Sequence, residues 1–242
     1  MKICILETDV LPDDFVPAHG GYPQMFHHWL APALPEAEFA CINVCAEDLT
    51  LPGPDAYDGY LITGSRAAAY DTDAWITRLK AFLQDLRRAR RPVGGICFGH
   101  QVMAEAFGGR VQKSPLGWNI GRRKFTVTEA GQGVLGPDAS LHALSFHQDH
   151  ITDLPPEAQV MLTGAPSPYA GLLYDFPAIS VQFHPEFHPD FVRDLATASR
   201  GTLLTDALVN SALNGLYEPL QAQRVAQAFA RVLRGRDTDR PG

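Results

Sequence analysis

Short apolar runs alternate with longer segments of helical periodicity in the first 110 residues of the chain. The short runs lack a polar face, which is typical of strands that are buried on both sides. The longer segments carry apolar residues every three or four positions, as amphipathic helices do. The pattern predicts strands at 2–8, 37–44, 57–65 and 92–96, and helices at 21–34, 71–91 and 98–109. This alternation favours a parallel sheet with helices on both faces.

The pattern changes after residue 110, where polar and apolar residues alternate and turn residues become frequent. An antiparallel excursion is expected at 110–115 and 122–129, closely spaced strands at 159–165, 170–175 and 178–185, and helices from about 188 onward, with about the last six residues frayed. We therefore expect a single α/β domain over residues 1–242, with a core at about 1–190 and C-terminal helices at about 190–236. Its central sheet is expected to be mostly parallel, flanked by helices, with an antiparallel extension.

Composition and charge are those of an ordinary globular protein, with 45% hydrophobic and 19% charged residues. The net charge of −7 argues against a general binder of nucleic acids or anionic membranes. No run approaches the ~20 apolar residues of a membrane span, and the N-terminal segment is expected to be a first strand rather than a signal peptide. The cysteines form no C-x-x-C pair, which indicates reduced thiols and a cytoplasmic location. Cys4, Cys41 and Cys45 are expected to be small buried residues.

Cys97 has a different setting, because it lies between a predicted strand and a predicted helix in Gly95-Ile96-Cys97-Phe98-Gly99. This G-x-C-x-G spacing is typical of a nucleophile elbow, a turn so sharp that the residues two before and two after the nucleophile must be small. The helix N-terminus favours a thiolate, and the Phe98 N–H would face an oxyanion on an attacked carbonyl. Taken alone, the pentapeptide leaves both a structural cysteine and a nucleophile open.

A histidine and a carboxylate that could complete this chemistry end the predicted strand near 181–187. His184 would serve as base for the Cys97 thiol, and Glu186 would orient its imidazole. His184 and His188 also flank Glu186, but the proline after each histidine excludes the helix that an H-E-x-x-H zinc site requires. We therefore expect no metal and no other cofactor.

Four features of the chain occur in the order found in the class I glutamine amidotransferase family, which the chain resembles over most of residues 1–187. They are a strand that ends at Gly64, the elbow at 95–101, a His-x-Asp segment at 147–149 and the His-Pro-Glu at 184–186. The resemblance implies a flavodoxin-like single domain, similar to the amidotransferase domain of GMP synthase and to γ-glutamyl peptidases. One departure is that Ser65 and Arg66 follow Gly64, where the family usually has a second glycine and a proline.

The resemblance also implies roles for individual residues. Cys97, His184 and Glu186 correspond to the catalytic triad, and the N–H groups of Gly64 and Phe98 to the oxyanion hole. The implied substrate-binding residues are Gln101, Phe146, His147 and Gln148, of which the last three lie in a predicted loop at 145–150.

These features predict hydrolysis of the γ-glutamyl amide bond of glutamine or another γ-glutamyl compound, through a γ-glutamyl thioester on Cys97. A standalone γ-glutamyl hydrolase or peptidase is favoured, because no synthetase domain follows in this chain and because of the Ser65-Arg66 loop. The alternatives are a glutaminase subunit that supplies ammonia to a separate synthetase partner, and a non-catalytic binding protein of the same fold. The expected partner is a small-molecule substrate, not a nucleic acid or a membrane, and the oligomeric state stays open.

Overall fold

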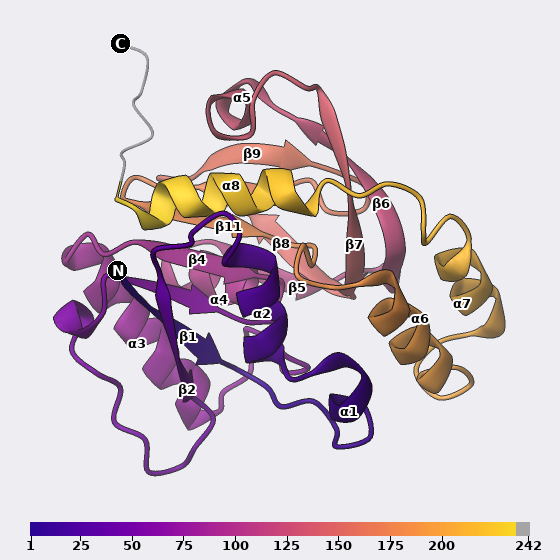
Figure 1. Ribbon diagram of the computed structural model, residues 1–242, viewed down its shortest axis with the longest axis horizontal. Coiled ribbons are helices and arrows are strands. Elements are labelled where there is room, and N and C mark those ends of the chain that lie inside the picture. The colour runs from indigo at the N-terminus through magenta and orange to yellow at the C-terminus, as the bar shows by residue number, and fades with distance from the viewer. Residues whose placement is uncertain (236–242) are drawn as a thin grey trace.

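A nine-stranded sheet forms the centre of the protein, seen in a computed structural model that describes residues 1–235 (Figure 1). The strand order is β2-β1-β3-β4-β11-β10-β9-β6-β7. The first five strands in this order are parallel to one another, and the last four form an antiparallel extension that begins where β10 pairs with β11. The predicted α/β fold with a parallel core is therefore confirmed. The strand bounds are β1 Lys2–Glu7, β2 Glu38–Asn43, β3 Gly59–Ile62, β4 Val93–Ile96, β6 Asn119–Val127, β7 Ser140–His147, β9 Gln159–Thr163, β10 Gly171–Leu173 and β11 Ala178–Val181.

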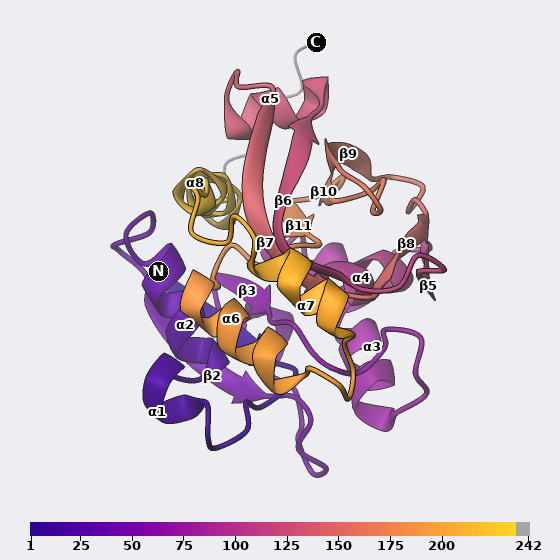
Figure 2. The same ribbon diagram turned by 90° about the vertical axis from the view of Figure 1, so that its right-hand side faces the viewer.

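Helices cover both faces of the parallel strands, as Figure 2 shows. α2 (Tyr22–Leu30) and α8 (Ala222–Leu233) pack on one face, and α3 (Ala74–Arg88) and α4 (Phe98–Ala106) on the other. The side chains of β1 alternate between the two faces of the sheet. Ile3 and Ile5 lie in the core layer of α2 and α8, and Cys4 and Leu6 lie in the core layer of α3 and α4. This burial on both faces explains why β1 reads as a continuous apolar run.

The remaining elements are short. α1 (Val16–His19) follows β1, a 3-10 helix (Pro54–Ala56) precedes β3, and β5 (Arg110–Lys113) pairs with β8 (Asp149–Asp153) in a separate antiparallel sheet. α6 (Pro189–Ala198) and α7 (Asp206–Leu213) lie at one end of the central sheet, at the right in Figure 1. The residues expected to fray at the C-terminus fall in 236–242, outside the described part. Within residues 1–235, no helix has the length and hydropathy needed to cross a membrane.

Several elements differ from the sequence-based expectation. The pattern does not predict α5 (Glu129–Leu135), a short helix with two glycines that begins where the Thr128 hydroxyl accepts a hydrogen bond from the Gly131 N–H. Nor does it predict β7, which pairs with β6 along its whole length. The expected loop at 145–150 is instead the end of β7 and the start of β8. Pairing with a distant strand overrides the polar local composition here.

The turn from β4 into α4 is as tight as the glycine spacing predicts. A Cβ on Gly95 would lie 2.5 Å from Met103 Sδ, and a Cβ on Gly99 would lie 2.5 Å from the Ile62 carbonyl oxygen. Both distances are far below van der Waals contact. The glycines thus allow α4 to start directly against β3 and β4, which places Cys97 at the carboxyl edge of the parallel strands.

We predict that Gly99→Ala destabilises the protein by about 1–3 kcal/mol, because the added methyl group has no room against the backbone of Ile62. Gly133→Ala is the matched control. It lies in α5, where a Cβ would meet no atom within 4 Å, and it should be neutral or stabilising by up to about 1 kcal/mol. Urea unfolding measures both variants, and equal stabilities would contradict the tight turn.

Candidate active site

Cys97 lies between β4 and α4 in a strained backbone conformation, with φ 53° and ψ −102°. Positive φ is uncommon for a residue with a side chain, and such strain is concentrated at functional sites. The Cys97 N–H donates to the Val181 carbonyl at 2.9 Å, so β11 supports the turn. The side chain stands at the N-terminus of the nine-residue α4, where the helix dipole favours negative charge on the sulfur.

His184 lies three residues beyond the end of β11 and is fixed on several sides. Its N–H donates to the Leu144 carbonyl of β7 at 2.8 Å, and its ring stacks on Phe187 with 3.9 Å between centroids. The His184 Nδ1–H donates to Glu186 Oε1 at 2.7 Å, because an ionised carboxylate can only accept. The Nε2 atom is therefore the ring nitrogen left to exchange a proton with the Cys97 sulfur, whose negative charge acts on the same ring.

The charges around His184 favour its protonated form. Burial alone disfavours an imidazolium, but the adjacent negative charges of Cys97 and Glu186 outweigh it and raise the pKa of His184 to about 10. The side chains of His184 and Glu186 are only 5% and 1% exposed, so solvent screens these charges little. His184 can therefore carry a transferable proton at neutral pH.

Two backbone N–H groups beside Cys97, those of Gly64 and Phe98, have no hydrogen-bond partner within residues 1–235. A Cβ on Gly64 would lie 2.9 Å from His184 Cε1 and 3.7 Å from Cys97 Cβ, so the loop after β3 passes directly beside the triad. The Thr8 hydroxyl donates to the Gly64 carbonyl at 2.9 Å and holds this loop in place. Free N–H groups at this position are what an oxyanion hole requires, and that role stays a prediction.

A cavity of about 450 Å³ opens in front of Cys97. Its wall includes every residue that was predicted to bind substrate, namely Gln101, Phe146, His147 and Gln148. The Gln101 Nε2 donates to the Asp149 carbonyl at 2.9 Å, and the same carbonyl lies 2.9 Å from His147 Nδ1. Burial lowers the pKa of His147 to about 3, so this ring is neutral at physiological pH. The structure thus brings these residues together, and their binding role stays a prediction.

Gln182 is a residue of the site that the sequence reasoning missed. Its side chain is fully buried, and its Nε2 donates to Cys97 Sγ at 3.8 Å while its Oε1 accepts from Gln101 Nε2 at 3.2 Å. It therefore links the nucleophile to a predicted substrate-binding residue. The signal was an amide side chain within the mostly apolar run at 178–183, because a buried amide needs partners.

The unusual Ser65-Arg66 loop contributes an ordered ion pair to the same cavity. Arg66 Nε and Nη2 each donate to one oxygen of Asp9 at 2.8 Å, and the Arg66 backbone N–H donates to Asp9 Oδ2 at 2.9 Å. Asp9 follows β1 and Arg66 follows β3, which are adjacent parallel strands. The carboxyl edge of the sheet therefore brings the two residues together, a pairing that the sequence pattern does not reveal.

The other three cysteines differ in part from the expectation of burial. Cys4 is buried, Cys45 is half-buried and Cys41 is exposed, so the expectation is wrong for Cys41. Cys41 lies on β2, the edge strand of the sheet, most of whose residues are partly or fully exposed. None of the three lines the cavity in front of Cys97.

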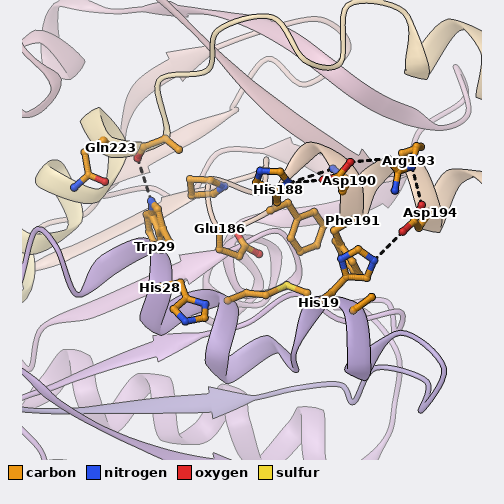
Figure 3. A pocket seen from close by; sticks show the side chains of 15 residues that line it. His19, His28, Trp29, Glu186, His188, Asp190, Phe191, Arg193, Asp194 and Gln223 are labelled. Carbon is orange, nitrogen blue, oxygen red and sulfur yellow. Dashed lines mark hydrogen bonds and ion pairs between the residues drawn. The ribbon is translucent and has the colours of Figure 1, made fainter.

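A second cavity, of about 590 Å³, lies beyond Glu186 between α2, α6 and the start of α8 (Figure 3). Glu186 borders it, and its Oε2 is buried without a hydrogen-bond partner in residues 1–235. His19 and His188 on the wall contact Asp194 and Asp190 at 2.9 Å and 3.4 Å. In the described part of the chain, no three His, Cys, Asp or Glu residues are arranged to hold a metal ion.

The sequence model of the family Glutamine amidotransferase class-I matches residues 25–192. The chain belongs to the class I glutamine amidotransferase family. This confirms the resemblance that the elbow and the His-Pro-Glu motif indicated. The fold is similar to the crystal structure of glutamine amido transferase from Methylobacillus flagellatus, with a TM-score of 0.75 at 20% identity, over 97% of this chain and 94% of that one.

Two curated relatives are similar to parts of this amidotransferase-family chain. Gamma-glutamyl peptidase 5 of Arabidopsis thaliana is 34% identical over 138 residues, which are 55% of each chain. A glutamine-hydrolysing GMP synthase subunit from Methanopyrus kandleri is 34% identical over 101 residues, 39% of this chain and 51% of that one. The matched segment thus spans about half the length of these relatives.

We predict that Glu186→Gln lowers the pKa of His184 by a unit or more, because the substitution removes a buried negative charge beside the ring. Nuclear magnetic resonance of the histidine ring signals follows the titration. In the unchanged protein His184 should lose its proton near pH 10, and in the variant closer to neutrality. His142, which is outside the triad and the cavity, is the internal control. Identical His184 titrations in the two proteins would contradict the charge coupling.

Proposed function

We propose that the protein is a cysteine-dependent hydrolase that cleaves the γ-glutamyl amide bond of glutamine or of another γ-glutamyl compound. The observation that carries the proposal is that Cys97 and His184 line one cavity, with Glu186 hydrogen-bonded to His184 from behind and free N–H groups at Gly64 and Phe98 beside the sulfur. Membership of the class I glutamine amidotransferase family supports the same chemistry.

In the first half-reaction, Cys97 Sγ attacks the γ-carbonyl carbon, and an electron pair moves to the carbonyl oxygen. The N–H groups of Gly64 and Phe98 stabilise this oxyanion. When the intermediate collapses, the C–N bond breaks and the protonated His184 gives its proton to the leaving amine. A γ-glutamyl thioester on Cys97 remains.

In the second half-reaction, water attacks the thioester while His184 accepts one of its protons. Collapse of this intermediate releases glutamate and returns the Cys97 thiolate beside protonated His184. Glu186 keeps Nδ1 hydrogen-bonded throughout, so that Nε2 is the nitrogen that exchanges the proton. The enzyme ends in the state in which it began.

A standalone γ-glutamyl hydrolase or peptidase is favoured over a subunit that supplies ammonia. The cavity of about 450 Å³ is in the size range of sites for ligands much larger than ammonia, so it has room for a substituted leaving amine. The similarity to a γ-glutamyl peptidase supports this choice. The similarity to a GMP synthase subunit keeps the amidotransferase alternative, in which a separate synthetase accepts the ammonia.

We predict that the purified protein alone hydrolyses glutamine or a γ-glutamyl amide, and that Cys97→Ala lowers kcat by at least about 10³-fold without unfolding the protein. Amine release from a panel of γ-glutamyl compounds measures turnover, and circular dichroism checks the fold. Cys41→Ala is the matched control, because this thiol lies on the exposed edge strand outside the cavity and its loss should leave turnover intact.

The contrary outcomes separate the alternatives. Turnover that appears only when a synthetase partner is added would favour the amidotransferase alternative. Failure of Cys97 to react with a glutamine-like chloroketone, together with no turnover, would favour a non-catalytic binding protein. Full activity of the Cys97→Ala variant would show that Cys97 is not the nucleophile.

A further inference from the structure

The cavity in front of Cys97 has two ends that differ in their walls. At one end, Gln101 and His147 share the Asp149 carbonyl, and Lys113 lies opposite Asp149 in the pairing of β5 with β8. At the other end, Phe187 stacks on His184, and Tyr22 stacks on Phe187 with 6.5 Å between centroids. The loop from Gly64 to Arg66 also borders this second end, because Gly64 lies against the His184 ring.

The proposed reaction determines which end receives the leaving amine. His184 gives the proton to that amine, so the amine nitrogen must lie within hydrogen-bond reach of the His184 ring. Any substituent on the nitrogen then extends along the wall formed by Tyr22, Phe187 and the Ser65-Arg66 loop. The γ-glutamyl part occupies the opposite end, beside Gln101 and His147.

The Arg66 side chain exposes one edge of its guanidinium group at the leaving-group end of the cavity. Its Nε and Nη2 are bound to Asp9, whose side chain is only 12% exposed, whereas the Arg66 side chain is 74% exposed. Its Nη1 has no partner within residues 1–235. An arginine held on one edge by a carboxylate loses little rotamer freedom when a ligand binds its other edge.

The charge of this free edge makes it suited to an anionic group. The neighbouring wall residues Val10, Leu11 and Pro12 offer apolar side chains and Tyr22 is largely apolar, so Arg66 is the cation on this side of the cavity wall. Because Arg66 Nη2 also donates to the Val10 carbonyl oxygen at 3.4 Å, the group left for a ligand is Nη1, which can donate a charge-assisted hydrogen bond to a carboxylate oxygen. A neutral leaving amine such as ammonia would make no use of it.

We propose that Arg66, held by Asp9, binds a carboxylate on the leaving amine, and that the preferred substrates are γ-glutamyl amino acids or peptides that carry such a carboxylate. The inference rests on the proposed function and names its substrate class. It also gives a binding role to Arg66, which follows Gly64 and Ser65 at the position where this chain departs from the usual pattern of its family.

The test compares γ-glutamylglycine with γ-glutamylglycinamide, two substrates that differ only in the carboxylate of the leaving amine. The unchanged protein should show a kcat/KM about tenfold or more higher for γ-glutamylglycine, as a charge-assisted hydrogen bond would give. In Arg66→Met this ratio should fall to about one or below. The ratio is used because it cancels any general effect of the substitution on the triad.

Two further variants make the result specific. Arg66→Met leaves the Asp9 carboxylate unpaired, which could itself repel an anionic substrate. Asp9→Asn combined with Arg66→Met removes that charge, and the ratio should stay near one. Lys113→Met removes a cation from the opposite end of the same cavity and should keep the ratio of the unchanged protein.

Each contrary outcome overturns a defined part of the inference. Equal kcat/KM values for the two substrates in the unchanged protein would overturn the carboxylate subsite and leave the proposed function intact. An equal loss on both substrates in Arg66→Met would assign Arg66 to the γ-glutamyl end instead. If neither these substrates nor glutamine is hydrolysed, the proposed function falls and the subsite with it.

Discussion

The close approach of Gly99 to the carbonyl of Ile62 is the contact on which the rest of the site depends. It allows α4 to begin directly against β3, and the chain between β4 and α4 must then turn within one residue. That residue is Cys97, whose positive φ is tolerated because buried elements hold both of its sides. The sulfur is therefore held at a helix N-terminus by close packing and by the hydrogen bond from the Cys97 N–H to the Val181 carbonyl.

The strand order of the sheet positions His184, the catalytic partner proposed for the Cys97 sulfur. β11 pairs with β4 in parallel, so the chain that leaves β11 reaches the carboxyl edge beside Cys97. The antiparallel extension then contributes, because the Leu144 carbonyl of β7 fixes the backbone of His184. Burial of the charged row of Cys97, His184 and Glu186 would be unfavourable for each group alone, and each charge compensates the next.

The two ends of the cavity differ because different loops at the carboxyl edge of the sheet form their walls. The loops after β1 and β3 supply the Asp9–Arg66 pair and the Gly64 N–H, whereas the β7 and β8 region supplies the groups around Asp149. His184 stands next to the former loops, so the proton donor and the arginine share one end. The loop after β3 thus carries both Gly64, which lies against the His184 ring, and Arg66, which borders the cavity two residues later.

Much of the fold could be predicted from local pattern. The strands of the parallel half, the helices on both faces and the steric need for Gly95 and Gly99 follow from periodicity and chain geometry. The prediction was weakest where long-range pairing decides, as at residues 145–150, which were expected to form a loop but lie at the end of β7 and the start of β8. Cys41 is exposed because β2 is an edge strand, and the position of a strand within the sheet cannot be predicted from the local sequence pattern.

By itself, the sequence determined the family, the α/β alternation and the residues that could act as nucleophile, base and orienting acid, because these depend on neighbours a few positions away. Only the tertiary structure decided that Gln182 contacts the Cys97 sulfur, that Glu186 takes Nδ1 of His184, and that Arg66 is held by Asp9. The physical reason is that a buried polar group is defined by its partner, and strand order and register choose that partner from anywhere in the chain.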